Sequence, residues 1–377
     1  MSKFISSTPI NFDQRLIGII KRVYKDDTLI LKGFNVVNEK KITGFISKKS
    51  HNQLSKKFKK LPGLLNTKSF NNLSKNDIIG IYPNGTCELL FKQDSEHNSL
   101  FVTEKCNNNC IMCSQPRVRK DDIQENYTLN MNLINLLPKK TLSIGITGGE
   151  PTLLDNRLYF LLEKLAKRLE KTAIHILTNG RRFSDLNYTQ ILSSLSANER
   201  ITFGVPVFSD YYQDHDFITQ VKNSFYQTMQ GLYNLARYDQ NIELRIILQK
   251  HCVKRLDKLA KYILKNLPFT QHVAFMGIEL CGNALRNIDY VWIDPDIYNK
   301  LLIESVSLLK MNGMDVSIYN IPLCLLPESL WKYSVNSISD WKREYYTFCD
   351  QCSARLLCGG VFESSKDFLR RIILEPI

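Results

Sequence analysis

The chain has 377 residues, which is more than a single domain of roughly 100–200 residues usually holds. Apolar residues make up 44% of it, no apolar run approaches the ~20 residues of a membrane span, and the first 15 residues contain no apolar signal-peptide core. We therefore expect a soluble, cytoplasmic protein with no membrane partner.

The net charge of +13 is concentrated at the start of the chain. Residues 1–75 contain 16 Lys and Arg against 4 acidic residues, which gives +12. Such a region either binds nucleic acid or an acidic partner, or is a solvated lysine-rich surface. Because no aromatic-basic motif accompanies the charge, we favour the second interpretation and expect no nucleic-acid partner.

Residues 1–98 contain short apolar stretches separated by turn residues. The stretches at 16–20, 28–31 and 78–82 are typical of strands, and Asn84-Gly85 is a good hairpin turn. We predict a basic, β-rich N-terminal domain over residues 1–98.

From residue 99 the pattern changes to strands that alternate with amphipathic helices. Strands are predicted at 100–103, 142–147, 173–177, 201–207, 242–248 and 272–278, and helices at 153–171, 186–196, 224–238, 253–265 and 295–311. This alternation indicates a parallel α/β sheet, and six units fit a partial (β/α)6 barrel over 99–315 better than a closed barrel of eight. In such folds the chemistry lies at the carboxyl ends of the strands. Residues 316–377 are predicted to form a small cysteine-rich extension.

A group of three cysteines follows the first barrel strand directly: Cys106, Cys110 and Cys113. Thiolates are soft ligands that suit iron–sulfur clusters and zinc. Three of them can hold three irons of a four-iron cluster and leave the fourth iron open for a substrate. A zinc loop that takes a distant fourth ligand remains the alternative.

Glycine-rich turns stand at the ends of later strands. The second strand ends in Gly148-Gly149-Glu150-Pro151, the third in Thr178-Asn179-Gly180, and the sixth in a turn over 277–282. Glycines let a ligand approach the backbone closely, and Glu150 offers an acceptor for an ammonium group. Each turn alone is a weak signal, but their occurrence at successive strand ends is a strong combination.

Residues 99–290 resemble the radical S-adenosylmethionine (SAM) superfamily, whose signature is CxxxCxxC. The resemblance implies a [4Fe-4S] cluster whose free iron binds the methionine moiety of SAM. One electron from the reduced cluster then yields a 5′-deoxyadenosyl radical, which takes a hydrogen atom from the substrate.

The resemblance also implies roles for particular residues. The turn at 148–150 would hold the methionine amino group, the turn at 277–282 would lie along the adenosine, and Ser209 or Asp210 would reach the ribose. No catalytic side chain can be named beyond the cluster ligands. The cofactor-binding residues expected in this way are Gly148, Gly149, Glu150, Pro151, Asn179, Ser209, Asp210, Gly277, Ile278 and Gly282.

A second cysteine group lies in the C-terminal extension. Cys349, Cys352 and Cys358 follow the spacing Cys-x2-Cys-x5-Cys, and Cys324 lies upstream. Four thiolates close either a second cluster or a structural zinc site. Because the spacing resembles the auxiliary-cluster domains of peptide-modifying members of the superfamily, we favour an iron–sulfur cluster over zinc.

The stretches 319–327, 337–342 and 358–365 resemble the radical SAM maturases of His-Xaa-Ser peptide systems. The resemblance implies maturation of a ribosomally made peptide or protein, with a second radical SAM maturase and an electron donor as partners. Two alternatives remain open. One is modification of RNA or a nucleobase, and the other is a non-catalytic, cluster-bearing partner that docks peptides.

Overall fold

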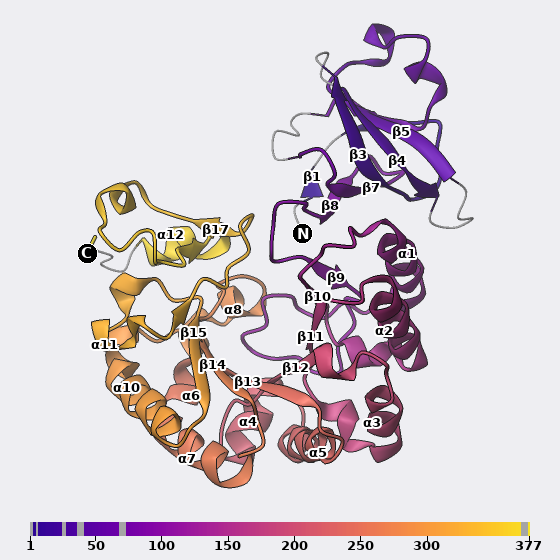
Figure 1. Cartoon of the computed structure of the whole chain (residues 1–377). Coiled ribbons are helices and arrows are strands. Elements are labelled where there is room, and N and C mark those ends of the chain that lie inside the picture. Colours follow the sequence, from indigo (N-terminus) through magenta and orange to yellow (C-terminus); the bar gives the residue numbers. More distant parts are fainter. Residues whose placement is uncertain (1–2, 5–6, 25–27, 36–40, 68–72, 371–375) are drawn as a thin grey trace. The chain divides into compact units, whose positions relative to one another are not determined.

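The computed structural model describes residues 3–4, 7–24, 28–35, 41–67, 73–370 and 376–377. The chain divides into two compact units (Figure 1). The first contains residues 1–102, 122–146 and 156–172, and the second contains residues 103–121, 147–155 and 173–377. In the described part of the chain, no helix combines the length and the apolarity needed to cross a membrane.

The first unit begins with an eight-stranded sheet, which confirms the β-rich character predicted for this region. Its strand order is β1-β8-β7-β3-β4-β5-β6-β2, and all neighbours are antiparallel except β5 and β6. Strands β7 and β8 pair across the predicted Asn84-Gly85 turn, where Gly85 has a φ of 84°. The bounds are β1 Lys3–Phe4, β2 Thr8–Ile10, β3 Leu16–Tyr24, β4 Thr28–Asn35, β5 Lys41–Ser47, β6 Gly63–Leu65, β7 Ile78–Ile81 and β8 Cys87–Phe91, with 3₁₀ turns at His51–Gln53 and Phe58–Lys60.

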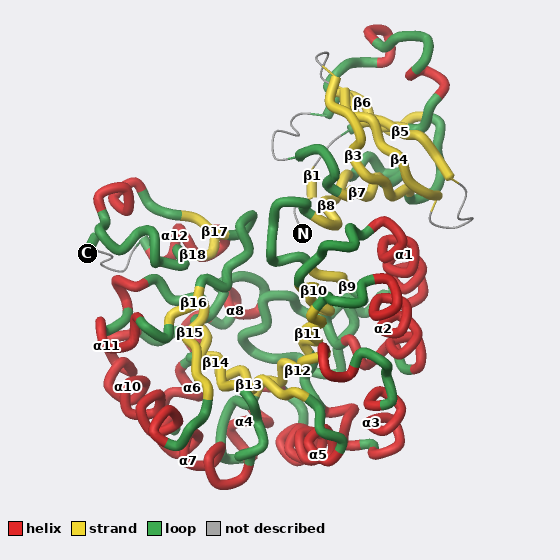
Figure 2. The backbone as a smooth tube through the Cα atoms, in the orientation of Figure 1, coloured by secondary structure: helices red, strands yellow, loops and turns green. Residues whose placement is uncertain are grey.

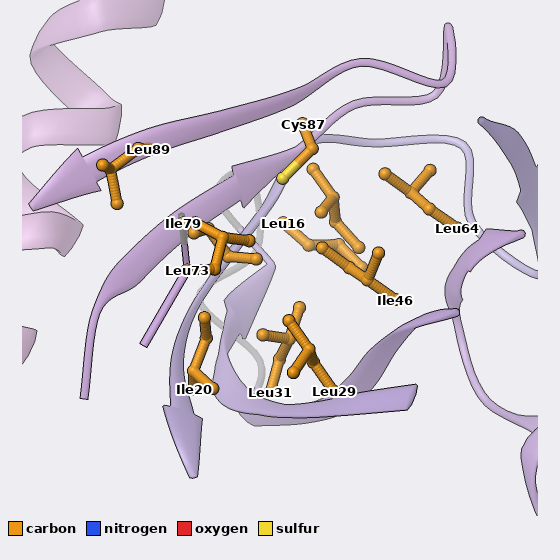
Figure 3. Packing of buried hydrophobic residues seen from close by; sticks show 11 residues of the cluster. Leu16, Ile20, Leu29, Leu31, Ile46, Leu64, Leu73, Ile79, Cys87 and Leu89 are labelled. Atoms are coloured by element: carbon orange, nitrogen blue, oxygen red, sulfur yellow. The ribbon is translucent and has the colours of Figure 1, made fainter. Parts of the chain in front are cut away.

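One face of this sheet carries an apolar core (Figure 3). Leu16 and Ile20 on β3 meet Leu29 and Leu31 on β4, and all four are at most 2% exposed. Each such side chain contributes about 1.5–3 kcal/mol by leaving water, so the sheet has a core of its own. Cys87 belongs to this core.

The rest of the first unit consists of β9 (Ser99–Phe101), most of β10 (Ser143–Thr147), α1 (Ile123–Leu136) and α2 (Asn156–Arg168). Helix α2 buries four leucines at helical spacing: Leu158, Leu161, Leu162 and Leu165. The helix predicted from residue 153 begins later, because a 3₁₀ turn occupies Pro151–Leu154 and Asp155 has a φ of 49°.

The second unit contains a curled parallel sheet in the order β16-β15-β14-β13-β12-β11 (Figure 2). Helices α3, α5, α7 and α10 lie along its outer side, so the predicted α/β partial barrel is confirmed. Strand β15 was not predicted: Asp315 pairs with His272 on β14, inside the parallel sheet. The bounds are β11 Ala173–Leu177, β12 Ile201–Pro206, β13 Asn241–Ile247, β14 His272–Met276, β15 Asp315–Tyr319, β16 Ser334–Val335, α3 Leu186–Ser193, α4 Tyr212–Thr219, α5 Ser224–Arg237, α6 Lys250–Val253, α7 Leu256–Asn266, α8 Asn283–Arg286, α9 Ile288–Val291 and α10 Pro295–Met311.

The C-terminal part of the second unit has little regular structure. Its two short strands, β17 and β18, pair antiparallel. A hydrogen bond and an ion pair connect this part to the turn after β14. Leu280 N donates to Ser365 Oγ over 2.9 Å, and Lys342 Nζ lies 3.1 Å from Glu279 Oε1. The elements are 3₁₀ turns at Leu323–Leu325, Thr347–Gln351 and Glu363–Ser365, with α11 Glu328–Trp331, β17 Arg343–Glu344, β18 Val361–Phe362 and α12 Lys366–Leu369.

Candidate cluster-binding site

Residues 106–113, here called the cysteine loop, are held by backbone hydrogen bonds from two directions. Asn109 N donates to Thr219 O and Ile111 N donates to Ile218 O at the end of α4, both over 3.0 Å. On another side, Asn283 N donates to Cys113 O over 2.8 Å. The loop is therefore fixed through its main chain, which leaves its thiols free to act as ligands.

The three thiols of the loop lie close enough to influence one another. All three are half-buried, and burial raises the pKa of each, to about 11 for Cys106. The pKa of Cys110 is raised further by the neighbouring thiolates of Cys113 and Cys106. Asn108 opposes these shifts: its backbone N–H donates to Cys106 Sγ over 3.4 Å, and its side chain lowers the pKa of Cys110. A bound metal cation would offset the repulsion between these thiolates.

The Gly-Gly-Glu-Pro turn after β10 packs directly against the start of the cysteine loop. Gly149 N donates to Thr103 O over 2.6 Å, and Glu150 N donates to Lys105 O over 2.8 Å. A Cβ on Gly148, whose φ is 154°, would lie 2.4 Å from Thr103 O, and a Cβ on Gly149 would lie 2.1 Å from Lys105 O. Because neither glycine carries a Cβ, the backbone at Thr103 and Lys105 can pack directly against the turn.

Glu150 is fully buried and links this turn to the end of β11. Oε1 accepts from Thr152 N (3.0 Å), Thr152 Oγ1 (2.7 Å) and Thr178 Oγ1 (2.6 Å), while Oε2 accepts from Asn179 N (2.7 Å). Burial raises the pKa of Glu150, and these four bonds oppose that rise. With one bond at Oε2 against three at Oε1, the carboxylate retains acceptor capacity at Oε2.

Asn179 connects the end of β11 to the cysteine loop. Its Nδ2 donates to Asn107 Oδ1 over 2.6 Å, and its side chain opposes the rise in the pKa of Cys106. Pro151 is buried at the first position of the 3₁₀ turn. Asn179 therefore contacts the cysteine loop, and Pro151 lies in the turn that packs against the start of that loop.

The polar groups after β12 are engaged with protein partners. Asp210 forms a two-pronged ion pair with Arg255, at 2.7 and 2.8 Å, and the Ser209 hydroxyl accepts from Tyr211 N over 3.1 Å. Ser209 is fully buried. The predicted ribose contact of these two residues stays a prediction.

The turn after β14 lies on the far end of the cysteine loop. Gly282 has a φ of 59°, and a Cβ there would lie 2.7 Å from Cys113 O and 2.6 Å from Ser114 O. Ile278 packs in an apolar cluster with Met112 of the loop. A Cβ on Gly277 would lie 2.5 Å from Asn320 O, so that glycine allows β15 to approach.

An open pocket borders the cysteine loop on its solvent side. Cys106 lines it together with four basic side chains: Lys105, Arg117, Arg119 and Arg286. A pocket with this charge suits an anionic group next to the cluster ligands. The sequence motifs did not indicate these basic residues, because they follow the cysteines without a recognisable spacing.

The second cysteine group also comes together in space. Cys324, Cys349, Cys352 and Cys358 line a single pocket, and the other three thiolates add to burial in raising the pKa of Cys324 to about 12. Backbone N–H groups of Leu323 and Gly360 donate to Cys358 Sγ over 3.5 and 3.4 Å. Hydrogen bonds of this kind surround sulfur ligands of iron–sulfur clusters.

Sequence reasoning missed several side chains that support the cysteine loop. Asn283 Nδ2 donates to Cys110 O over 3.1 Å, and Asn287 Nδ2 donates to Ile111 O over 2.8 Å. Arg181, directly after the Thr-Asn-Gly turn, also contacts the loop. A lone asparagine or arginine carries no sequence signal, because its partners are distant in the chain.

The donor set suits an iron–sulfur cluster at both cysteine groups. Within the described residues, no three His, Cys, Asp or Glu side chains converge closely enough to hold a single metal ion. At the cysteine loop, three thiols share one loop, and Cys106 Sγ accepts from Asn108 N over 3.4 Å. In the extension, four thiols line one pocket. These arrangements fit the thiolate ligation that such clusters require.

Comparison with known protein families finds one matching model. Residues 100–263 match the model of the radical SAM superfamily. A domain of this family would hold a [4Fe-4S] cluster and SAM, and Cys106, Cys110 and Cys113 are the residues that would ligate the cluster.

Individual proteins that resemble this chain are more distant. A putative glycyl-radical enzyme activating enzyme of Methanocaldococcus jannaschii is 27% identical over 184 residues, which is 46% of this chain and 47% of that protein. The chain thus spans about half the length of this curated relative.

Two solved structures illustrate the structural comparison. Streptococcus suis SuiB bound to S-adenosylmethionine is 14% identical, with a TM-score of 0.45, over 59% of this chain and 50% of that one. A radical SAM methyltransferase from Sphaerobacter thermophilus is 10% identical, with a TM-score of 0.41, over 83% of this chain and 77% of that one.

Proposed function

We propose that this protein is an enzyme that cleaves SAM reductively at a [4Fe-4S] cluster and modifies a peptide or protein by hydrogen-atom abstraction. The observation that carries the proposal is the convergence of three elements on the cysteine loop: the turn at 148–150, the turn at 178–180 and the turn at 277–282. When bound and reduced, the cluster would supply one electron to the sulfonium of SAM, whose cleavage gives methionine and a 5′-deoxyadenosyl radical.

The side chains of this chain supply positioning rather than proton transfer. Cys106, Cys110 and Cys113 would hold the cluster. Glu150 is oriented by four hydrogen bonds, and its remaining acceptor capacity at Oε2 suits the SAM amino group. The basic side chains of the adjoining pocket suit the SAM carboxylate.

We further propose that the extension binds a second iron–sulfur cluster. Cys324, Cys349, Cys352 and Cys358 would be its ligands, and their shared pocket supports this assignment. With four thiolates the second cluster is fully ligated, so its role is electron transfer or structure rather than binding of SAM.

A peptide or protein substrate is favoured over RNA by two observations. The curated relative carries a name that describes activation of another enzyme, and an enzyme is a protein substrate. The C-terminal stretches resemble maturases of His-Xaa-Ser peptides, for which a second maturase and an electron donor would be partners. The basic N-terminal region is the only support for the RNA alternative.

The test is an anaerobic assay of reconstituted, reduced protein with SAM and a peptide of His-Xaa-Ser repeats. We expect release of 5′-deoxyadenosine and a mass change in the peptide, both detected by mass spectrometry. A Cys113→Ala variant should lose both, whereas Cys252→Ala, which changes a buried cysteine outside both groups, should retain them. Stimulation by RNA instead of peptide would support nucleic-acid modification, and no 5′-deoxyadenosine at all would favour a non-catalytic docking partner.

A further inference from the structure

Arg181 forms a forked contact with the cysteine loop. It follows Gly180, whose φ is 77°, and begins the 3₁₀ turn Arg181–Ser184. Its Nη1 donates to Asn107 O over 2.8 Å and to Asn108 Oδ1 over 2.6 Å. One guanidinium thus fixes both the main chain and a side chain between the first two cysteines.

The contact with Asn108 determines which way that amide points. A guanidinium carries only donors, so the Asn108 oxygen must face Arg181. The backbone N–H of the same residue donates to Cys106 Sγ over 3.4 Å, so Asn108 links the guanidinium to a cysteine sulfur. Asn108 is 4% exposed, so water cannot easily substitute for either partner.

Helix α5 holds Arg181 in place from the other side. Arg181 Nε donates to Gln227 Oε1 over 2.7 Å, and Thr228 Oγ1 donates to Asn179 O over 3.2 Å. Because three donors of the guanidinium group have fixed acceptors, its position does not depend on a single bond. The cation also lies within electrostatic range of Cys106 and Cys110.

We propose that Arg181 is a positioning residue that fixes Asn108, whose backbone N–H donates to Cys106 Sγ, and thereby raises the reduction potential of the cluster on the cysteine loop. The inference rests on the proposed function, since it requires a cluster at that loop. Hydrogen bonds to the sulfur ligands and nearby positive charge both favour the reduced, more negative cluster. Arg181 supplies the charge itself and supplies the hydrogen bond through Asn108.

The test compares reconstituted full-length variants by potentiometric titration followed by electron paramagnetic resonance. The signal of interest is the one that a Cys110→Ala variant lacks. Arg181→Gln should shift its midpoint potential to a more negative value and speed iron loss to a chelator by about tenfold, because charge-assisted hydrogen bonds are lost. Arg181→Lys keeps the positive charge but loses the forked hydrogen bonds. Its midpoint potential and its rate of iron loss should lie between those of Arg181→Gln and the wild-type protein.

Arg182 provides the matched control. It is the adjacent arginine, it contacts Asp155, Asp185 and Tyr188 rather than the cysteine loop, and Arg182→Gln makes the same chemical change. The midpoint potential of the Arg182→Gln variant should equal that of the wild-type protein. A merely structural role for Arg181 would speed iron loss without moving the potential of the clusters that remain bound.

The dependence on Asn108 has its own test, which also applies if Arg181→Gln binds no iron. Asn108→Leu should shift the potential in the same direction, and the double variant Arg181→Lys/Asn108→Leu should shift it by less than the sum of the single shifts. An unchanged potential in Arg181→Gln or Asn108→Leu, or fully additive shifts, would overturn the inference. Absence of any cluster from the wild-type loop would instead overturn the proposed function.

Discussion

Single residues at the candidate site divide into those that the sequence indicates and those that only the fold reveals. The three cysteines of the loop and the Gly-Gly-Glu-Pro turn are visible in the sequence, because their residue types and spacing already imply their chemistry. Arg181 and Asn283 are not visible, because their partners lie more than 70 residues away in the chain. Asp210 shows a different limit, since its position after β12 was predicted but its ion pair with Arg255 was not.

Thr178 tests the hydrogen bonding around Glu150. Its hydroxyl donates to the buried carboxylate over 2.6 Å and accepts from Gly180 N over 3.2 Å. Thr178→Val keeps the shape but removes both bonds, and should lower the free energy of unfolding by about 2 kcal/mol. Denaturant unfolding of the metal-free chain measures this, and Thr178→Ser should recover most of the loss. Equal stability of the valine and serine variants would show that the hydroxyl contributes nothing.

Elements were predictable where one periodic pattern dominates. The helix at Pro295–Met311 and the strand at Ala173–Leu177 have the predicted bounds, because their apolar periodicity is uninterrupted. Helix α1 was missed because its buried face includes asparagines. Asn130, for example, is 1% exposed and satisfies its amide by donating to Phe101 O and Asn126 O.

Strand β15 was missed for a different reason. Its apolar positions are only Val316 and Ile318, and the alternating side chains are polar, as in Ser317. Such a short alternating pattern is typical of an isolated half-buried strand, and nothing local reveals a parallel neighbour. Its pairing with β14 depends on a crossover through α10, which is a property of the fold.

Gly231 tests the packing of α5 against the turn after β11. A Cβ at this position would lie 2.2 Å from Gly180 O and 3.3 Å from Phe183 Cβ. Gly231→Ala should therefore destabilise the chain by about 2 kcal/mol, although alanine favours a helix by about 1 kcal/mol.

The control for this variant is Gly359→Ala, whose Cβ would meet no atom closer than 3.6 Å. It should change the free energy of unfolding by less than about 0.5 kcal/mol in the same denaturant experiment. If Gly231→Ala is as stable as this control, the helix and the turn are not in the close contact described.

At the scale of the whole molecule, the second compact unit contains both cysteine groups. The two groups are separate, since three thiols share the cysteine loop and four line the pocket of the extension. The sequence indicated both groups by cysteine spacing. It could not indicate that the turns after several strands contact the cysteine loop, because those contacts require the curled sheet.

Iron content tests the two-site organisation. If each group binds a four-iron cluster, reconstituted protein should contain roughly eight iron atoms per chain. Replacing Cys324, Cys349, Cys352 and Cys358 together by alanine should leave roughly four, measured by colorimetric iron and sulfide assays. Zinc in the wild-type protein, lost in the same variant, would contradict a cluster in the extension.

The most direct test of the account is whether SAM binds to an iron that no side chain ligates. Electron paramagnetic resonance of the reduced, reconstituted protein should change when SAM is added, and isotopic labelling of the SAM amino nitrogen should produce a hyperfine coupling to the cluster. A Cys106→Ala, Cys110→Ala, Cys113→Ala triple variant should show no such change. A wild-type spectrum that is identical with and without SAM, or a cysteine loop that takes up only zinc, would contradict the central claim.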